Sequence, residues 1–191
     1  MIVKSSKIQT HPHWTYFLCL EEDVIRLSRW IEFAESNFHC YSIEIARLLM
    51  AASSEVDVLA KIVCRSISDS SKAASIGKYQ TELTATYPTI HKALTTIPRF
   101  GIELHPWSSW ESAQNPPSWW TATNKVKHHR SEHFEEATLI NLLNAMAGLI
   151  VLITLLYKNR MNELQPLSQL FIPKAFLLNM GDGRVLFRDR A

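Results

Sequence analysis

A nearly unbroken apolar run over residues 139–157 constrains this chain more than any other feature of its sequence. The run approaches the length that spans a bilayer, but its strictly apolar part, residues 145–156, is short for that role. Asn141, Asn144 and Gly148 interrupt the run. A helix that is apolar around its whole circumference is usually the central helix of a core or an oligomer interface. We therefore expect a buried helix and no membrane partner, with a membrane span as the alternative.

The overall composition is that of one globular domain. The chain has 191 residues, of which 47% are hydrophobic and 20% are charged, so it can form a core of its own. Its formal net charge is only +2, so any nucleic-acid site has to be a local patch. The three cysteines are far apart and form no CxxC motif, and the first twelve residues lack a long apolar segment. The sequence therefore predicts a cytoplasmic protein without a signal peptide.

Helical periodicity accounts for most of the chain. Ser42 is the predicted N-cap of the second helix, and Ser131 is the predicted N-cap of the last one. Prolines and a glycine punctuate residues 89–117, which also contain several tryptophans, so we expect an irregular loop there. The predicted helices cover residues 13–38, 42–66, 72–87, 119–128 and 131–160.

The residues after the last predicted helix have a different pattern. Two apolar stretches, residues 176–179 and 184–187, flank the sequence Met-Gly-Asp-Gly at residues 180–183. Such a sequence is typical of a β-hairpin turn. We therefore predict a mainly α fold with a C-terminal extension over residues 161–191 that contains a small β-hairpin.

The candidate functional site is a short basic segment, residues 124–130, which reads Asn-Lys-Val-Lys-His-His-Arg. On a helix, one face of this region presents an indole, an amide, an ammonium group and an imidazole, those of Trp120, Asn124, Lys127 and His128. No acidic residue lies within the segment, and Arg130 precedes the predicted start of the last helix, where unpaired N–H groups favour anions. This face suits a phosphate or an RNA backbone, with Trp120 available for base stacking. The alternative is a solvated basic turn whose charges pair with the second helix.

Three side chains close to this segment have the spacing of a partial metal site, namely His129, His133 and Glu136. No fourth ligand is evident, so we predict no metal and regard the histidines as surface residues. On the second predicted helix, Glu44, Arg47 and Glu55 lie near one face, because eleven residues are close to three helical turns. Charges on a mostly apolar helix are either paired with one another or face a cleft.

The order of these features resembles HEPN-like proteins (the higher eukaryotes and prokaryotes nucleotide-binding domain) over residues 13–160. The resemblance is carried by a tryptophan-rich loop and four motifs, which are Ser54-Glu55, Lys61, Asn124-x-Val-Lys127-His128-x-Arg130, and Asn141 with Asn144 in the long last helix. It implies an up-and-down bundle of four or five helices, often dimeric. Many members are metal-independent ribonucleases of toxin–antitoxin or phage-defence systems, and others are non-catalytic. Active members have a wider Arg–His spacing than the two residues that separate Arg130 from His133.

These features together predict a protein that binds RNA or a nucleotide, and the resemblance adds ribonuclease activity without any cofactor. In the catalytic interpretation His128 is the general acid or base, while Lys127 and Arg130 stabilise charge on the phosphoryl group. The expected substrate-binding residues are Asn124, Trp120 and Glu55, the last of which would tune the imidazole. The alternative is a non-catalytic interaction protein, in which the last helix and the C-terminal hairpin build a dimer and the basic segment is structural. For the protein in general we expect a homodimer, because the last helix has more apolar surface than one small bundle covers.

Overall fold

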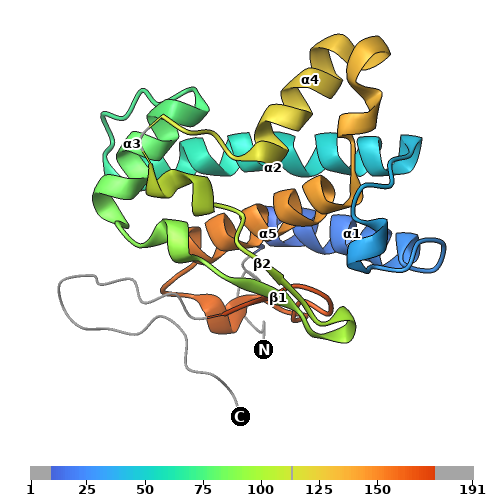
Figure 1. Ribbon diagram of the computed structural model, residues 1–191. Coiled ribbons are helices and arrows are strands. Elements are labelled where there is room, and N and C mark those ends of the chain that lie inside the picture. Colours follow the sequence, from blue (N-terminus) through green and yellow to red (C-terminus); the bar gives the residue numbers. More distant parts are fainter. Residues whose placement is uncertain (1–9, 113, 175–191) are drawn as a thin grey trace, which may run out of the picture.

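The computed structural model describes residues 10–112 and 114–174, and this part of the chain is mainly helical (Figure 1). It contains five α-helices, α1 (Pro12–Leu27), α2 (Ile43–Ile67), α3 (Ile76–Thr86), α4 (Ser118–His133) and α5 (Leu139–Leu156). A small antiparallel sheet of order β2-β1-β3 is formed by β1 (Thr95–Ile97), β2 (Ile102–Leu104) and β3 (Ile172–Pro173). The mainly α fold class predicted from the sequence is confirmed.

Helices α2 and α5 form the centre of the molecule (Figure 1). By length and composition α5 could cross a membrane, but 78% of its residues are buried against the rest of the chain. Helix α2 covers one side of α5, while α1 and the sheet approach it from another. The apolar run is therefore the core helix of the bundle, and the chain itself covers the surface that we expected at a dimer interface.

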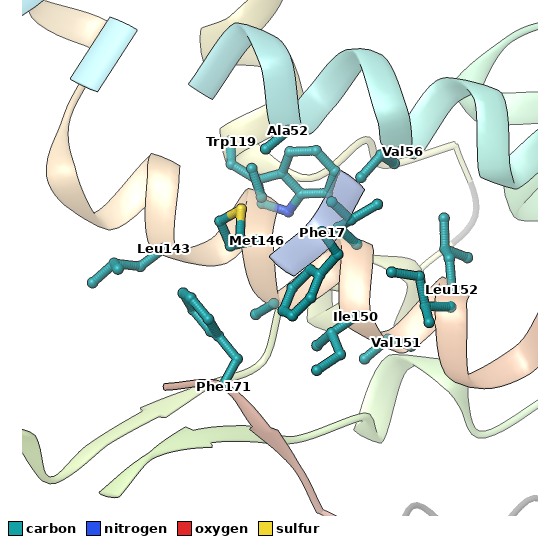
Figure 2. Packing of buried hydrophobic residues seen from close by; sticks show 14 of the residues in the cluster. Phe17, Ala52, Val56, Trp119, Leu143, Met146, Ile150, Val151, Leu152 and Phe171 are labelled. Atoms are coloured by element: carbon teal, nitrogen blue, oxygen red, sulfur yellow. The ribbon is translucent and has the colours of Figure 1, made fainter. Parts of the chain in front are cut away.

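Two tryptophans reach the core because one position of α5 lacks a side chain. Figure 2 shows the indole of Trp119 between Ala52 of α2 and Met146 of α5. A Cβ atom on Gly148 would stand 3.1 Å from Trp119 Cζ2 and 3.2 Å from Trp107 Cζ2. Such distances are shorter than ordinary van der Waals contact, so a side chain at this position would require the two indoles to shift by a few tenths of an ångström.

The first helix is shorter than predicted, because α1 ends at Leu27 instead of continuing to residue 38. The backbone N–H groups of Trp30 and Ile31 both bond to the carbonyl of Leu27, and the chain turns there. This turn allows Phe33 to become buried, with its ring 5.0 Å from that of Phe100. Burial of this aromatic ring stabilises the turn.

The start of the last helix also differs from the prediction. Ser131 lies within α4, and α5 begins only at Leu139, with Thr138 as its N-cap. The Thr138 hydroxyl accepts a hydrogen bond from the N–H of Asn141, and the N–H of Leu139 donates to the carbonyl of Cys40 at 2.9 Å. The bond to Cys40 ties the start of α5 to a distant segment, and residues 137–138 lie outside any helix, so tertiary contacts override the helical pattern of the sequence.

The second helix begins as predicted, since the Ser42 hydroxyl accepts a hydrogen bond of 3.1 Å from the N–H of Ile45. The third helix begins at Ile76, four residues later than predicted. Within the stretch predicted to be irregular, β1 and β2 form a hairpin whose turn contains Gly101 at φ +64°. Strands of three residues are too short to give an alternating pattern that the sequence could reveal.

The segment after α5 belongs partly to the same core. Leu164, Leu170 and Phe171 are buried, and the N–H of Lys174 donates to the carbonyl of Leu94 in front of β1. Residues 161–174 therefore pack against the same core as the helices. The predicted hairpin at residues 176–187 lies outside the described residues.

Candidate functional site

Helix α4 carries the candidate site, and its inner face fixes how the site is presented. Its buried residues recur at helical spacing, at Trp119, Ala122, Thr123 and Val126. The Thr123 hydroxyl lies 2.8 Å from that of Ser53 on α2, and the Trp119 indole donates to the carbonyl of Pro106. Because these contacts hold one face of α4 against the bundle, the predicted binding face points outward.

Three of the predicted site residues lie together on the outer face of α4. Trp120, Asn124 and His128 line one open hollow of about 360 Å³, together with Ile76 of α3. The indole of Trp120 is half-buried, while Asn124 and His128 are exposed. We call this feature the outer-face hollow. It combines a flat aromatic side chain with two hydrogen-bonding groups that solvent can reach.

Arg130 lies on the other side of a kink. The backbone of His129 has φ −138° and ψ 44°, which are not helical values. Figure 1 shows α4 (gold) rising away from α2 and the chain then turning back toward α5. Arg130 therefore lines a different groove, and our expectation that it stands beside the first residues of the last helix was wrong. The side chains of His128 and Arg130 do not share a cavity.

This second groove has a volume of about 960 Å³. Its walls are mostly apolar and come from α2 and from the chain after the kink, with Ile43, Ala46, Met50 and Phe134 beside Arg47 and Arg130. We call it the apolar groove. Ile43 is 78% exposed, and the nearby Tyr41 is 52% exposed. The sequence did not predict this groove, because its walls come from two segments that are far apart in the chain.

The charges of the basic segment are only partly compensated. Lys125 forms an ion pair with Glu136, across the turn that follows α4. Lys127 and Arg130 are exposed, and neither forms an ion pair with any residue that the structure describes. Two fixed positive charges thus remain available on the surface of this segment.

Glu55 does not belong to the site. Its Oε1 lies 2.6 Å from Nδ1 of His13 on α1, and both side chains are largely buried. The expected role of Glu55 in tuning His128 is therefore wrong, because the carboxylate is used to join α1 to α2.

The other charges of α2 form a structural network. Arg47 Nη2 lies 2.9 Å from Oδ2 of Asp23, and its Nε lies 3.0 Å from Oε2 of Glu44. The hydrogen bonds with Glu44 and Asp23 hold the pKa of Arg47 above its ordinary value. Of the two interpretations of these charges, mutual pairing holds for Glu44 and Arg47.

The histidines after the basic segment are not arranged as metal ligands. The kink at His129 interrupts the helical register, and the ring centres of His129 and His133 are 6.4 Å apart, with the rings nearly perpendicular. Within residues 10–112 and 114–174, no group of three His, Cys, Asp or Glu side chains has the geometry to hold a metal ion.

Comparisons with known proteins returned no relative. No protein-family model matches the chain, and neither the curated proteins nor the solved structures gave a match. The resemblance to HEPN-like proteins stays a prediction that rests on its motif residues. Function is therefore argued from the site itself.

Proposed function

We propose that the outer face of α4 binds single-stranded RNA or a nucleotide. The observation that carries this proposal is the shared lining of the outer-face hollow by Trp120, Asn124 and His128, with Lys127 exposed on the same helix. An indole stacks on a base of any identity, and an ammonium group contacts phosphate. The amide and the imidazole then hydrogen-bond to a base edge or to a 2′-hydroxyl.

The exposure of these groups favours a binding mode with little sequence preference. Lys127 and Arg130 would supply phosphate contacts at the two sides of the kink. Each such contact releases counterions, so the affinity should fall with salt by a logarithmic slope of about 0.7 per contact on a single strand. With two contacts, we expect weak binding whose affinity falls with salt by a logarithmic slope of about 1.4.

A further proposal is that the protein also cleaves the RNA that it binds. In a metal-independent reaction His128 would exchange a proton with the 2′-hydroxyl or the leaving oxygen, and Lys127 would stabilise the developing charge. Arg130 could assist only if the substrate passed over the kink, because it lines the apolar groove instead of the outer-face hollow. We therefore place binding ahead of cleavage.

The test is fluorescence anisotropy of a short labelled single-stranded RNA at low salt, with cleavage followed on gels of the same samples. Trp120→Ala and Lys127→Ala should both weaken binding. His128→Ala should remove cleavage and weaken binding less than either of them, because it removes one neutral hydrogen bond. Lys78→Ala is the matched control, since Lys78 is exposed on α3 outside the hollow. Equal affinities of wild type, Trp120→Ala and Lys127→Ala would refute the proposal.

A second proposal concerns the oligomeric state, for which the apolar groove is the specific observation. We propose that two copies of this chain pair through the groove, because pairing would cover its apolar walls together with the exposed side chains of Ile43 and Tyr41. Arg130 lines the groove, and the exposed Glu132 and Glu135 follow it in the chain. In a two-fold arrangement the arginine of one protomer can therefore meet an acid of its partner.

A further inference from the structure

A polar hollow lies beside the tryptophan-rich loop, and neither of the proposed functions uses it. Its volume is about 560 Å³, within the range of small-molecule sites. It is adjacent to the outer-face hollow, because Pro116, Thr121 and Lys125 line both. We call it the polar pocket. The side chains that matter for its chemistry are Ser109, Ser118, Lys125, Glu136 and Asn144.

Asn144 gives the pocket a hydrogen-bonding group from the core helix. Fourteen of the 18 residues of α5 are buried, whereas Asn144 is half-buried and lines the pocket. Its Nδ2 donates to the carbonyl of Ile140 at 3.0 Å, and no described residue donates to its Oδ1. A ligand in the pocket would therefore find an acceptor held in place by the amide's other hydrogen bond.

Two serines line the same pocket as this acceptor. Ser109 comes from the 3-10 helix η4 (Ser108–Glu111), and its Oγ has no hydrogen-bond partner among the residues that the structure describes. Ser118, the first residue of α4, is exposed and lines the same pocket. Hydroxyls both donate and accept, so they suit a ligand with several polar atoms.

The wall of the pocket also carries one charge of each sign. Lys125 and Glu136 pair with each other, and their side chains remain 42% and 32% exposed. Neither forms a second ion pair with any described residue. The two charges cancel, so a ligand with a net charge would leave one charge uncompensated. A zwitterion instead gives each wall charge a second partner of opposite sign.

We propose that the polar pocket binds a small zwitterionic molecule of the free amino-acid class. The carboxylate of the ligand lies at Lys125, and its ammonium group donates to Glu136 and to Oδ1 of Asn144. The serine hydroxyls contact the remaining polar atoms. This proposal is independent of RNA binding, because it uses neither Trp120 nor Lys127.

The experiment uses the full chain and the free L-amino acids as probes. Differential scanning fluorimetry at millimolar concentrations identifies those that raise the melting temperature, and isothermal titration calorimetry then measures their affinities. We expect at least one free amino acid to bind. Its N-acetyl and carboxamide derivatives should each bind about tenfold more weakly or worse, because each lacks one charge-assisted interaction.

Variants locate the binding site. Lys125→Met and Glu136→Gln should each weaken binding of the same amino acid by about tenfold. Lys61→Met is the matched control, because Lys61 pairs with Asp57 at similar exposures, 36% and 33%, outside the pocket. This control should leave the affinity unchanged.

Three outcomes would overturn the proposal. They are the failure of every free amino acid to bind, equal binding of the blocked derivatives, and unchanged affinity in both Lys125→Met and Glu136→Gln. The comparison of derivatives needs only the wild-type chain, so it holds even if a variant folds poorly.

Discussion

Glu21, on α1, accepts a hydrogen bond of 2.9 Å from the backbone N–H of Leu170, 149 residues further along the chain. The same buried carboxylate accepts from the N–H groups of Gln169 and Phe171 and from the hydroxyl of Ser168. These four donors take the place of a positively charged partner. Glu21 thereby fastens the segment before β3 to the first helix.

Replacing Glu21 should therefore destabilise the fold strongly. Glu21→Ala leaves several buried donors without an acceptor, and we expect it to lower the free energy of unfolding by about 3 kcal/mol. Urea denaturation followed by circular dichroism measures this change. Glu22→Ala is the control, because Glu22 is 64% exposed in an i,i+4 pair with Arg26. Glu22→Ala should lower the free energy of unfolding by less than about 0.5 kcal/mol. A loss in Glu21→Ala as small as that in Glu22→Ala would show that the Glu21 contacts are dispensable.

A methyl group on Gly148 should also be costly. Gly148→Ala places a Cβ 3.1 Å from Trp119 and 3.2 Å from Trp107, and both indoles are fully packed. We expect a loss of about 1–3 kcal/mol, the usual effect of overpacking, measured by thermal denaturation with tryptophan fluorescence. In Gly77→Ala the new Cβ meets nothing within 4 Å on α3, so higher helix propensity should leave stability unchanged or raise it. If Gly148→Ala leaves the stability unchanged, the two indoles can move away from α5.

The proposed homodimer can be tested at its most exposed apolar residue. Ile43→Glu adds a charge to a side chain that is 78% exposed, so the folded chain should keep its stability. Sedimentation velocity should show a dimer for wild type and a monomer for this variant, because a charge at an apolar interface is left unpaired. Val58→Glu, on α2 outside the groove, should stay dimeric. A wild-type monomer at tens of micromolar would end the dimer proposal.

Stability should fall at alkaline pH. Burial raises the pKa of the Cys64 thiol from 9.0 to about 12, with a smaller contribution from Glu82. Burial and a hydrogen bond to Asp57 likewise raise the pKa of the Tyr79 hydroxyl. A raised pKa in the folded state contributes stability that is complete below the unfolded value and is lost as the pH rises toward the folded value.

We therefore expect the melting temperature to drop between pH 9 and about 12. Thermal denaturation across this range measures the effect, and Cys64→Ala should show a shallower pH dependence despite a lower stability at neutral pH. If the melting temperature falls equally steeply with pH in wild type and in Cys64→Ala, Cys64 does not cause the fall.

The sequence predicted those features that depend on neighbouring residues. The cap at Ser42 and the shared face of Trp120, Asn124 and His128 follow from helical spacing alone, and the structure agrees with both. The separation of Arg130 from that face depends on the kink at His129 and on the late start of α5.

The late start of α5 depends in turn on a hydrogen bond between Leu139 and Cys40, which are far apart in the chain. A pairing over such a distance leaves no periodic signal in the sequence. The role of Glu55 was mispredicted for the same reason, because nothing near Glu55 in the sequence indicates His13 as its partner.

The fastening of Leu170 to Glu21 has a consequence for synthesis on the ribosome. Helices α1 and α5 are made before the segment that lies between Glu21 and the sheet, so the apolar surface later covered by Phe171 stays exposed until that segment has emerged. A nascent chain stopped before residue 168 would present this surface to chaperones or to other nascent chains. Covering this surface thus requires residues 168–171, which contribute no helix of their own.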